Sequence, residues 1–96
     1  MNLIRFLRPA ELELLDAAHF YELQAAGLGG QFLDKIDEAL EGIRTSPQRY
    51  PVISADIRRC LVQQFPYALI YRIDVDAIII LATMHLHRRP DYWVGR

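Results

Sequence analysis

Apolar residues in the first half of the chain recur at helical spacing. Between Pro9 and Gly27 the repeat is narrow and mostly of small residues, and it consists of Leu14, Ala17, Ala18, Tyr21 and Ala25. A second repeat follows the glycine-rich segment "GLGG" (residues 27–30), and it consists of Leu28, Phe32, Ile36, Leu40 and Ile43. A proline is tolerated in the first turn of a helix, and glycines suit a tight joint. The pattern therefore predicts a helical hairpin whose first helix begins near Pro9 and ends at Gly27.

The remaining segments have the alternation and the turn residues of extended strands. The segment "NLIRF" (residues 2–6) predicts a first strand, and three more are predicted over residues 57–65, 67–74 and 77–85. Pro47 and Pro51 bracket a loop, while residues 65–67 and 75–76 are short enough for tight connections. The order β-α-α-β-β-β is typical of an α+β fold, with the helical hairpin packed on one face of a small antiparallel sheet. We expect the first strand at a sheet edge and the opposite face to be partly open to a partner.

Length and composition predict a small soluble protein. The 96 residues make one domain, residues 1–96, with 52% hydrophobic and 24% charged residues. Cys60 is the only cysteine, and its place in a predicted strand beside Leu61 and Val62 favours a core residue over a nucleophile. The N-terminus lacks the apolar run of a secretory signal, and the longest apolar run, Ala77–Ala82, is far too short to span a bilayer. We expect a cytoplasmic protein without a metal or cofactor.

Charge is distributed unevenly along the chain although its net value is only −1. Residues 1–50 carry five basic and eight acidic residues, a net of −3, while residues 51–96 carry six arginines and four aspartates, a net of +2. The planar guanidinium group of arginine suits bidentate contacts with carboxylates and phosphates, so the second half suits an anionic partner. Arg58 and Arg59 are neighbours on a predicted strand and should point to opposite faces, where one of them could hold such a group.

The segment "HLHRRPDYW" (residues 85–93) concentrates side chains capable of chemistry. His85 and His87 have the spacing of two residues on one face of a strand, but a third metal ligand is missing. His85 is therefore either a hydrogen-bonded structural residue or a substrate contact. The arginines and aromatic rings that follow could neutralise and stack on exposed nucleotides. Alternatively, Trp93 folds back over the core after Pro90 turns the chain away from the sheet.

Four sequence segments, taken in order, resemble the RelE/ParE superfamily of toxins from bacterial type II toxin-antitoxin systems, also called plasmid-stabilisation proteins. These segments are "GLGGQF", "SPQRYP", "IRRCLVQQFPYALIYRI" and "ILATMHLHRRPDYW", and the resemblance extends from about Arg5 to Arg96. It implies a cytoplasmic toxin that inhibits growth and is neutralised by an antitoxin whose flexible C-terminal segment wraps around it. A hetero-oligomer with that antitoxin is expected.

The resemblance also implies roles for individual residues. RelE-like toxins cleave messenger RNA in the ribosome, whereas ParE-like toxins block DNA gyrase. The candidates for catalysis are His85, Arg88 and Tyr92. The candidates for binding the target or a phosphate are Arg58, Arg59, Arg72 and Arg89. The candidates for a structural tail are Pro90 and Trp93.

Two features favour the gyrase-blocking branch. The only lysine, Lys35, lies in a predicted helix, which departs from the basic sheet surface of RelE-like toxins. The arginine pair before "FPY" and the histidine that ends the last predicted strand are more similar to ParE-like sequences. Two alternatives stay open: a ribosome-dependent mRNA endoribonuclease, in which case the chain is an enzyme, and a non-toxic module that only binds the antitoxin.

Overall fold

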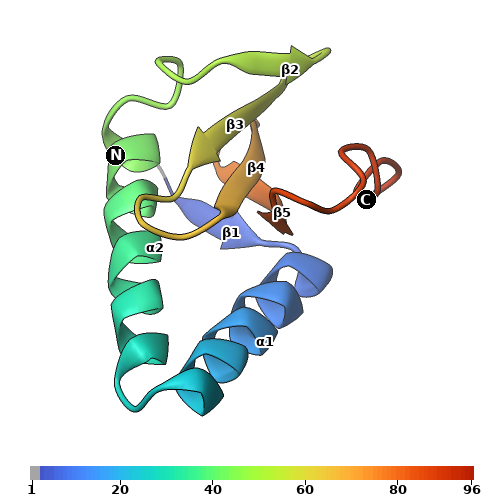
Figure 1. Ribbon diagram of the computed structural model, residues 1–96. Coiled ribbons are helices and arrows are strands. Elements are labelled where there is room, and N and C mark those ends of the chain that lie inside the picture. The colour runs from blue at the N-terminus through green and yellow to red at the C-terminus, as the bar shows by residue number, and fades with distance from the viewer. Residues whose placement is uncertain (1–2) are drawn as a thin grey trace.

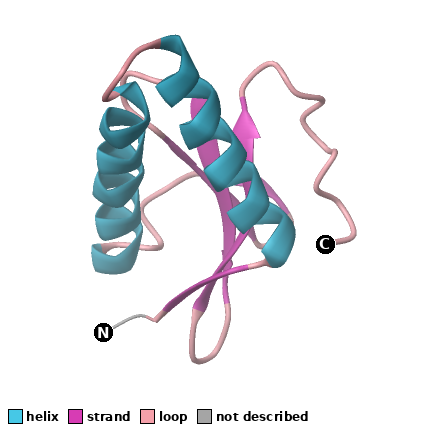
Figure 2. Ribbon diagram, turned by 90° about the horizontal axis from the view of Figure 1, so that it is seen from below, coloured by secondary structure: helices cyan, strands magenta, loops and turns pink. Residues whose placement is uncertain are grey.

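The computed structural model describes residues 3–96, which form a layer of helices and a layer of strands (Figure 1). The helices are α1 (Arg8–Gln24) and α2 (Leu28–Thr45). The strands are β1 (Ile4–Phe6), β2 (Val52–Ser54), β3 (Ile57–Leu61), β4 (Tyr67–Ile73) and β5 (Ile78–His85). The helical hairpin covers one face of the sheet, and the chain after β5 lies on the other side (Figure 2). The predicted α+β architecture is confirmed.

The sheet is mixed rather than antiparallel throughout. Its strand order is β1-β5-β4-β3-β2, and β1 is parallel to β5 while all other neighbours are antiparallel. The edge position predicted for the first strand is therefore confirmed, but its direction differs from the expectation. A long connection permits parallel pairing, whereas a tight hairpin permits only antiparallel pairing. Because the other elements all lie between β1 and β5 along the chain, no short turn fixes the direction of β1.

Several element boundaries differ from the sequence prediction. Strand β2 was not predicted, since it has only three residues and their apolar and polar positions do not alternate. Strand β3 ends at Leu61, since the chain turns through residues 62–66 with Gln64 at a φ of 70°. Helix α1 ends at Gln24, and Gly27, with a φ of 87°, instead caps the start of α2. Residue 2 of the first predicted strand lies outside the described residues.

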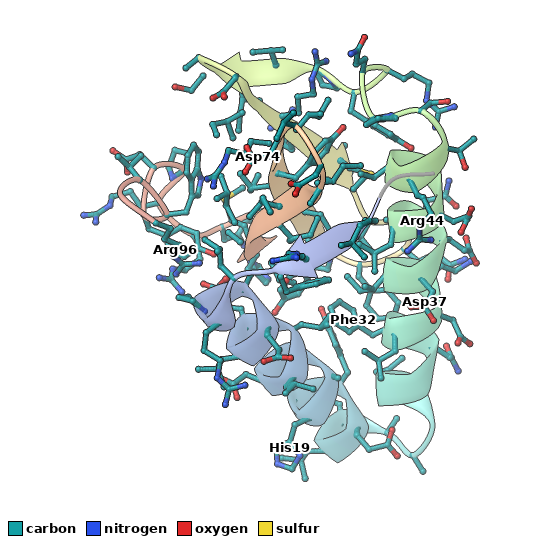
Figure 3. All side chains as sticks on the ribbon, turned by 180° about the vertical axis from the view of Figure 1, so that it is seen from behind. His19, Phe32, Asp37, Arg44, Asp74 and Arg96 are labelled. Atoms are coloured by element: carbon teal, nitrogen blue, oxygen red, sulfur yellow. The ribbon has the colours of Figure 1, made fainter. Side chains whose placement is uncertain are left out.

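Apolar side chains pack on both faces of the sheet. On the helix side, Phe32 of α2 points toward α1 and the sheet, whereas Asp37 of the same helix points outward (Figure 3). The predicted apolar stripe of α2 is confirmed, because Phe32, Ile36 and Ile43 are at most 1% exposed. On the opposite face, which we call the helix-free face, Trp93 packs with residues of β4 and β5, namely Ala68, Ile70, Ile79, Leu81, Ala82 and Met84.

A bulge at Leu81 decides which face the end of β5 presents. Tyr71 pairs with Ile80 and Ile70 pairs with Ala82, so Leu81 has no partner on β4. An extra residue in one strand reverses the alternation that follows it. As a result, Thr83 and His85 lie on the helix side together with Ile80, although strict alternation would have put them on the helix-free face.

Candidate functional site

A pocket of about 230 Å³ opens where α1 meets the end of β5 and the C-terminal tail, residues 86–96. We call it the tail pocket. Its lining residues are Glu13, Asp16, Ala17, Phe20, Tyr67, Thr83, His85, Arg88 and Tyr92. The three residues predicted as catalytic candidates, His85, Arg88 and Tyr92, are therefore brought together, and the bulge in β5 is what turns His85 toward them.

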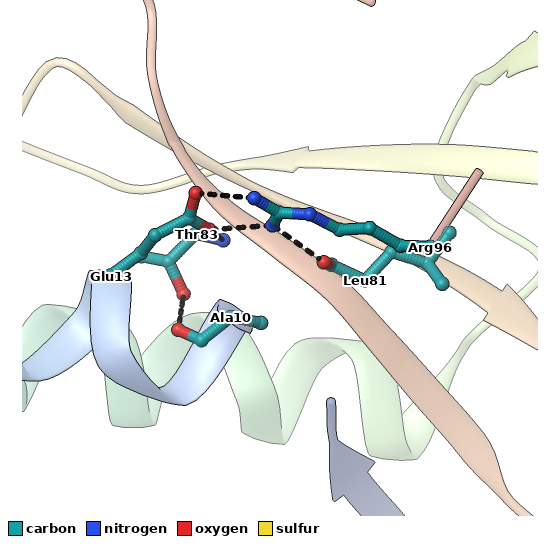
Figure 4. A network of polar contacts seen from close by, with 5 residues as sticks. All are labelled: Ala10, Glu13, Leu81, Thr83 and Arg96. Atoms are coloured by element: carbon teal, nitrogen blue, oxygen red, sulfur yellow. Dashed lines mark hydrogen bonds and ion pairs between the residues drawn. The ribbon is translucent and has the colours of Figure 1, made fainter. Parts of the chain in front are cut away.

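Glu13 and Arg96 form an ion pair at the inner side of this pocket (Figure 4). The two nitrogens of the guanidinium group, Nη1 and Nη2, each lie 3.0 Å from one carboxylate oxygen. Arg96 also donates to the backbone carbonyl of Leu81, and the backbone N–H of Thr83 donates to Glu13. Strand β1 pairs only with residues 78–80 of β5, so the edge of β5 beyond Ile80 has no neighbouring strand. The ion pair takes over the hydrogen bonds of that edge.

Tyr92 lies between two guanidinium groups. The Arg88 group is 3.9 Å and the Arg96 group 4.9 Å from the centre of its ring. Burial, followed by contact with the Glu13 carboxylate, raises the pKa of Tyr92 well above its ordinary value, although the two arginines act in the opposite direction. The same carboxylate raises the pKa of Arg96. Tyr92 is thus a neutral phenol that is better suited to donating a hydrogen bond than to transferring a proton.

His85 is held by neighbours on the sheet and in the tail. Its ring packs edge-on against Tyr67, with ring centres 5.0 Å apart, and its Nδ1 accepts a hydrogen bond from the backbone N–H of His87. The His87 ring lies 5.1 Å from that of His85. Within residues 3–96, no group of three or more histidine, cysteine or acidic side chains is placed to hold a metal ion. The free Nε2 of His85 is the nitrogen left for contact with another molecule.

The four arginines predicted to bind a target or phosphate do not form one cluster. Arg58 lies on the helix side and donates to the backbone carbonyls of Gln48 and Tyr50, so it holds the loop before β2. Arg59 pairs across the ladder with Ile70 and lies on the helix-free face, as the alternation predicts. Arg72 forms an ion pair with Asp74, and Arg89 forms an exposed one with Asp91.

The tail brings its own aromatic anchor to the helix-free face. Trp93 is only 7% exposed, and it lines a second pocket of about 250 Å³ together with Arg59, Met84 and Pro90. We call this the sheet-face pocket. Of the two interpretations of the aromatic tail, the structure has the one in which Trp93 folds back over the core. Tyr92, with Arg88 and Arg96 near its ring, is the tail aromatic residue that lines the tail pocket instead.

Sequence reasoning missed the ion pair beside the tail pocket, which joins the lining residue Glu13 to Arg96. They are 83 positions apart, and nothing in their spacing connects them. Glu13 had a sufficient explanation as an acidic residue near the start of a helix, where the dipole favours negative charge. Asp16 adds a second carboxylate to the pocket lining. Only the excess of acidic residues in the first half of the chain indicated that its surface could pair with an arginine-rich second half.

The charges of the tail pocket limit its chemistry. One carboxylate, Glu13, is neutralised by Arg96, while Asp16 also lines the pocket and Arg88 is the lining arginine. Cleavage of RNA requires cations that stabilise a phosphate as its charge increases. Tyr92 supplies a hydrogen-bond donor and His85 an imidazole, but two carboxylates lie beside a single lining arginine. The pocket is therefore better suited to hydrogen bonding than to holding a phosphate.

Comparison with known proteins gives a consistent picture of the family. Residues 4–90 match the family model described as the ParE toxin of the type II toxin-antitoxin system, parDE. Among solved structures, the chromosomal ParDE system from P. aeruginosa contains a chain of similar fold, with a TM-score of 0.73 and 18% sequence identity over 90% of this chain and 97% of that one. No curated protein matches the chain in sequence. Within residues 3–96, neither helix is long and apolar enough to cross a membrane.

Proposed function

Because the chain belongs to the family of ParE toxins of type II toxin-antitoxin systems, we propose that it arrests growth by blocking DNA gyrase and that a cognate antitoxin neutralises it. The family match over residues 4–90 carries this proposal. A toxin that acts by binding needs a surface for its target and one for its antitoxin, but no assembled catalytic centre. The arrangement of charged groups agrees with that requirement.

The dispersed arginines support a binding toxin over a nuclease. Arg58 and Arg72 are engaged within the fold, and Arg89 lies with Asp91 on the exposed tail. In the tail pocket the carboxylates of Glu13 and Asp16 offset the charges of Arg88 and Arg96. These described residues therefore provide no excess of positive charge for holding the phosphates of messenger RNA at His85.

The exposed apolar residues of α1 favour the binding of a partner protein. The helix exposes four large apolar side chains, Leu12, Leu15, Phe20 and Leu23. Contiguous exposed apolar residues mark interaction sites in soluble proteins, and an amphipathic helix from a partner is one way to cover them. The solved chain of similar fold belongs to the chromosomal ParDE system of P. aeruginosa. We therefore propose an antitoxin as the partner of this chain.

Induced expression of the chain, alone and together with a candidate antitoxin from an adjacent short reading frame, tests the toxin and the antitoxin. We expect growth arrest with the chain alone and normal growth with both. Purified chain should then inhibit supercoiling of relaxed plasmid by gyrase and leave ribosome-bound message intact. Normal growth with the chain alone would contradict a toxin and favour a module that only binds the antitoxin.

The second candidate function is a ribosome-dependent mRNA endoribonuclease. The observation that favours it is the convergence of His85, Arg88 and Tyr92 on one pocket. In such an enzyme His85 would transfer a proton and Tyr92 would donate one or stack on a base. Cleaved message in a purified translation reaction, together with unimpaired gyrase, would establish this candidate in place of the first.

A further inference from the structure

The sheet-face pocket is separate from the tail pocket and lies on the helix-free face. It has a volume of about 250 Å³, and its apolar walls include Ile53, Met84 and Val94. Ile53 belongs to β2, which is the last strand in the sheet and pairs only with β3. An edge strand with exposed residues can be extended by a peptide from another chain, which places alternate side chains on the sheet face.

Two nitrogen donors at this pocket lack acceptors. Arg59 Nε and Trp93 Nε1 are both shielded from solvent, and neither has a hydrogen-bond partner within residues 3–96. Both residues line the pocket. Donors shielded in this way are nearly always satisfied in native proteins, so an unpaired pair beside a cavity points to an acceptor that comes from outside. The guanidinium group adds a positive charge, which makes a carboxylate the favoured acceptor.

Asp91, the acidic residue that lines the sheet-face pocket, is not the acceptor for these two donors. Its carboxylate pairs with Arg89 and its side chain is 72% exposed. Arg72, on the same face as Arg59, already has Asp74 as its partner. Arg59 therefore differs from Arg72 and Arg89, because no ion pair joins it to any residue in the described part of the chain.

From this geometry we infer that the sheet-face pocket binds the carboxylate of an aspartate or glutamate in an extended, otherwise apolar segment of a partner protein lying beside β2. A small shift of the two side chains exposes the shielded Arg59 Nε and Trp93 Nε1 and lets the carboxylate accept from both. The apolar neighbours of the acidic residue pack on Ile53, Met84 and Val94. The inference rests on the proposed function in one respect only, namely that the antitoxin supplies this segment.

Nuclear magnetic resonance spectroscopy of the indole N–H tests the site directly. Trp93 is the only tryptophan, so the intact chain gives one indole signal. The probe is the capped tripeptide acetyl-Leu-Glu-Leu-amide, and the matched probe replaces Glu with Gln. We expect a saturable downfield shift of the Trp93 signal at millimolar peptide and roughly tenfold weaker binding of the Gln peptide, because a charged acceptor is lost.

Two variants assign the binding to the proposed donors. Arg59→Gln should weaken binding of the Glu peptide roughly tenfold, whereas Arg89→Gln, at an exposed arginine of the tail, should leave it unchanged. An unmoved indole signal, or equal affinity for the two peptides, overturns the inference. If the chain arrests growth and is rescued by its neighbour but ignores both peptides, only this site is refuted. If the Glu peptide binds yet the chain is harmless, the proposed function fails instead.

Discussion

Glu13 in the second turn of α1 and Arg96 in the tail, 83 residues apart, form a two-pronged ion pair that closes the open edge of β5. Their side chains are 20% and 19% exposed, so the pair is more shielded than the other ion pairs of the described chain. Through it, the tail is fixed to the first helix, and Tyr92 is placed between Arg88 and Arg96. This contact joins two walls of the tail pocket, because Glu13 and Tyr92 both line it.

Replacing Arg96 with alanine should therefore destabilise the fold. It removes the guanidinium donor of the Glu13 carboxylate and of the Leu81 carbonyl, and we expect a loss of about 1–3 kcal/mol in the free energy of unfolding. Urea denaturation measures it. The matched control is Arg8→Ala, which breaks the exposed pair with Glu11 and should cost less than about 1 kcal/mol. Equal losses in the two variants would mean that the tail contact has no special weight.

The joint between the helices provides a second matched pair of substitutions. A Cβ atom added at Gly29 would lie 2.6 Å from the carbonyl oxygen of Ala18, whereas one added at Gly30 would meet nothing within 4 Å. We expect Gly29→Ala to destabilise by about 1–3 kcal/mol through overpacking. Gly30→Ala should stabilise by about 0.5–1 kcal/mol, because alanine is the better helix former. Thermal unfolding of both variants should move the Tm in opposite directions, and a shift in one direction for both would contradict the close approach of α1 and α2.

Local patterns in the sequence were sufficient to predict the helices and the central hairpins. Phe32, Ile36 and Ile43 follow one face of α2 in steps that the helix itself imposes, and their burial confirms the prediction. Likewise, the aliphatic strands β4 and β5 are joined by a connection too short for any arrangement but a hairpin. Each of these inferences depends on residues only a few positions apart.

The features that needed the structure all depend on distant pairing. The bulge at Leu81 has no sequence signal of its own, yet it turns His85 from one face of the sheet to the other. The direction of β1 is set by its partner β5, more than 70 residues later. The candidate site is affected most, because Glu13 and Arg96 acquire their role only when α1 and the tail lie together. Sequence reasoning therefore named His85, Arg88 and Tyr92 but missed Glu13, which adds a negative charge beside them.

Tyr71 should make stability fall in alkaline solution. Burial is the main cause that raises its pKa from 10.0 to about 12, and its hydroxyl donates to the carbonyl of Pro47 at 2.6 Å. A group whose pKa is higher in the folded state contributes fully below the unfolded pKa, and that contribution is lost as the pH rises from about 10 through the folded value. Tyr71→Phe should cost about 1 kcal/mol at pH 8 and reduce the decline between pH 10 and 12. Urea denaturation at several pH values checks this, and an unchanged decline would show that other groups cause it.

Arg58 and Arg59 should affect the molecule in different ways despite being neighbours. Arg58→Ala removes the hydrogen bonds to Gln48 and Tyr50 and should lower the free energy of unfolding by about 1–3 kcal/mol. Arg59→Ala removes no hydrogen bond or ion pair made within the described chain, so stability should change by less than about 0.5 kcal/mol. Denaturation of the single variants separates these effects. Loss of toxicity in Arg59→Ala could then be assigned to target binding, whereas the same loss in Arg58→Ala could result from unfolding.

Substitutions in the tail pocket should distinguish a binding toxin from a nuclease. His85→Ala removes the imidazole that could transfer a proton, and Tyr92→Phe removes the hydroxyl while keeping the ring between Arg88 and Arg96. If the chain blocks gyrase by binding, both variants should arrest growth and inhibit supercoiling to within about threefold of the parent, since no proton is transferred. A nuclease would instead lose about 100-fold or more of its cleavage rate when the acid or base is removed. Growth arrest and supercoiling assays on folded variants decide between them, with circular dichroism as the check that the fold is intact.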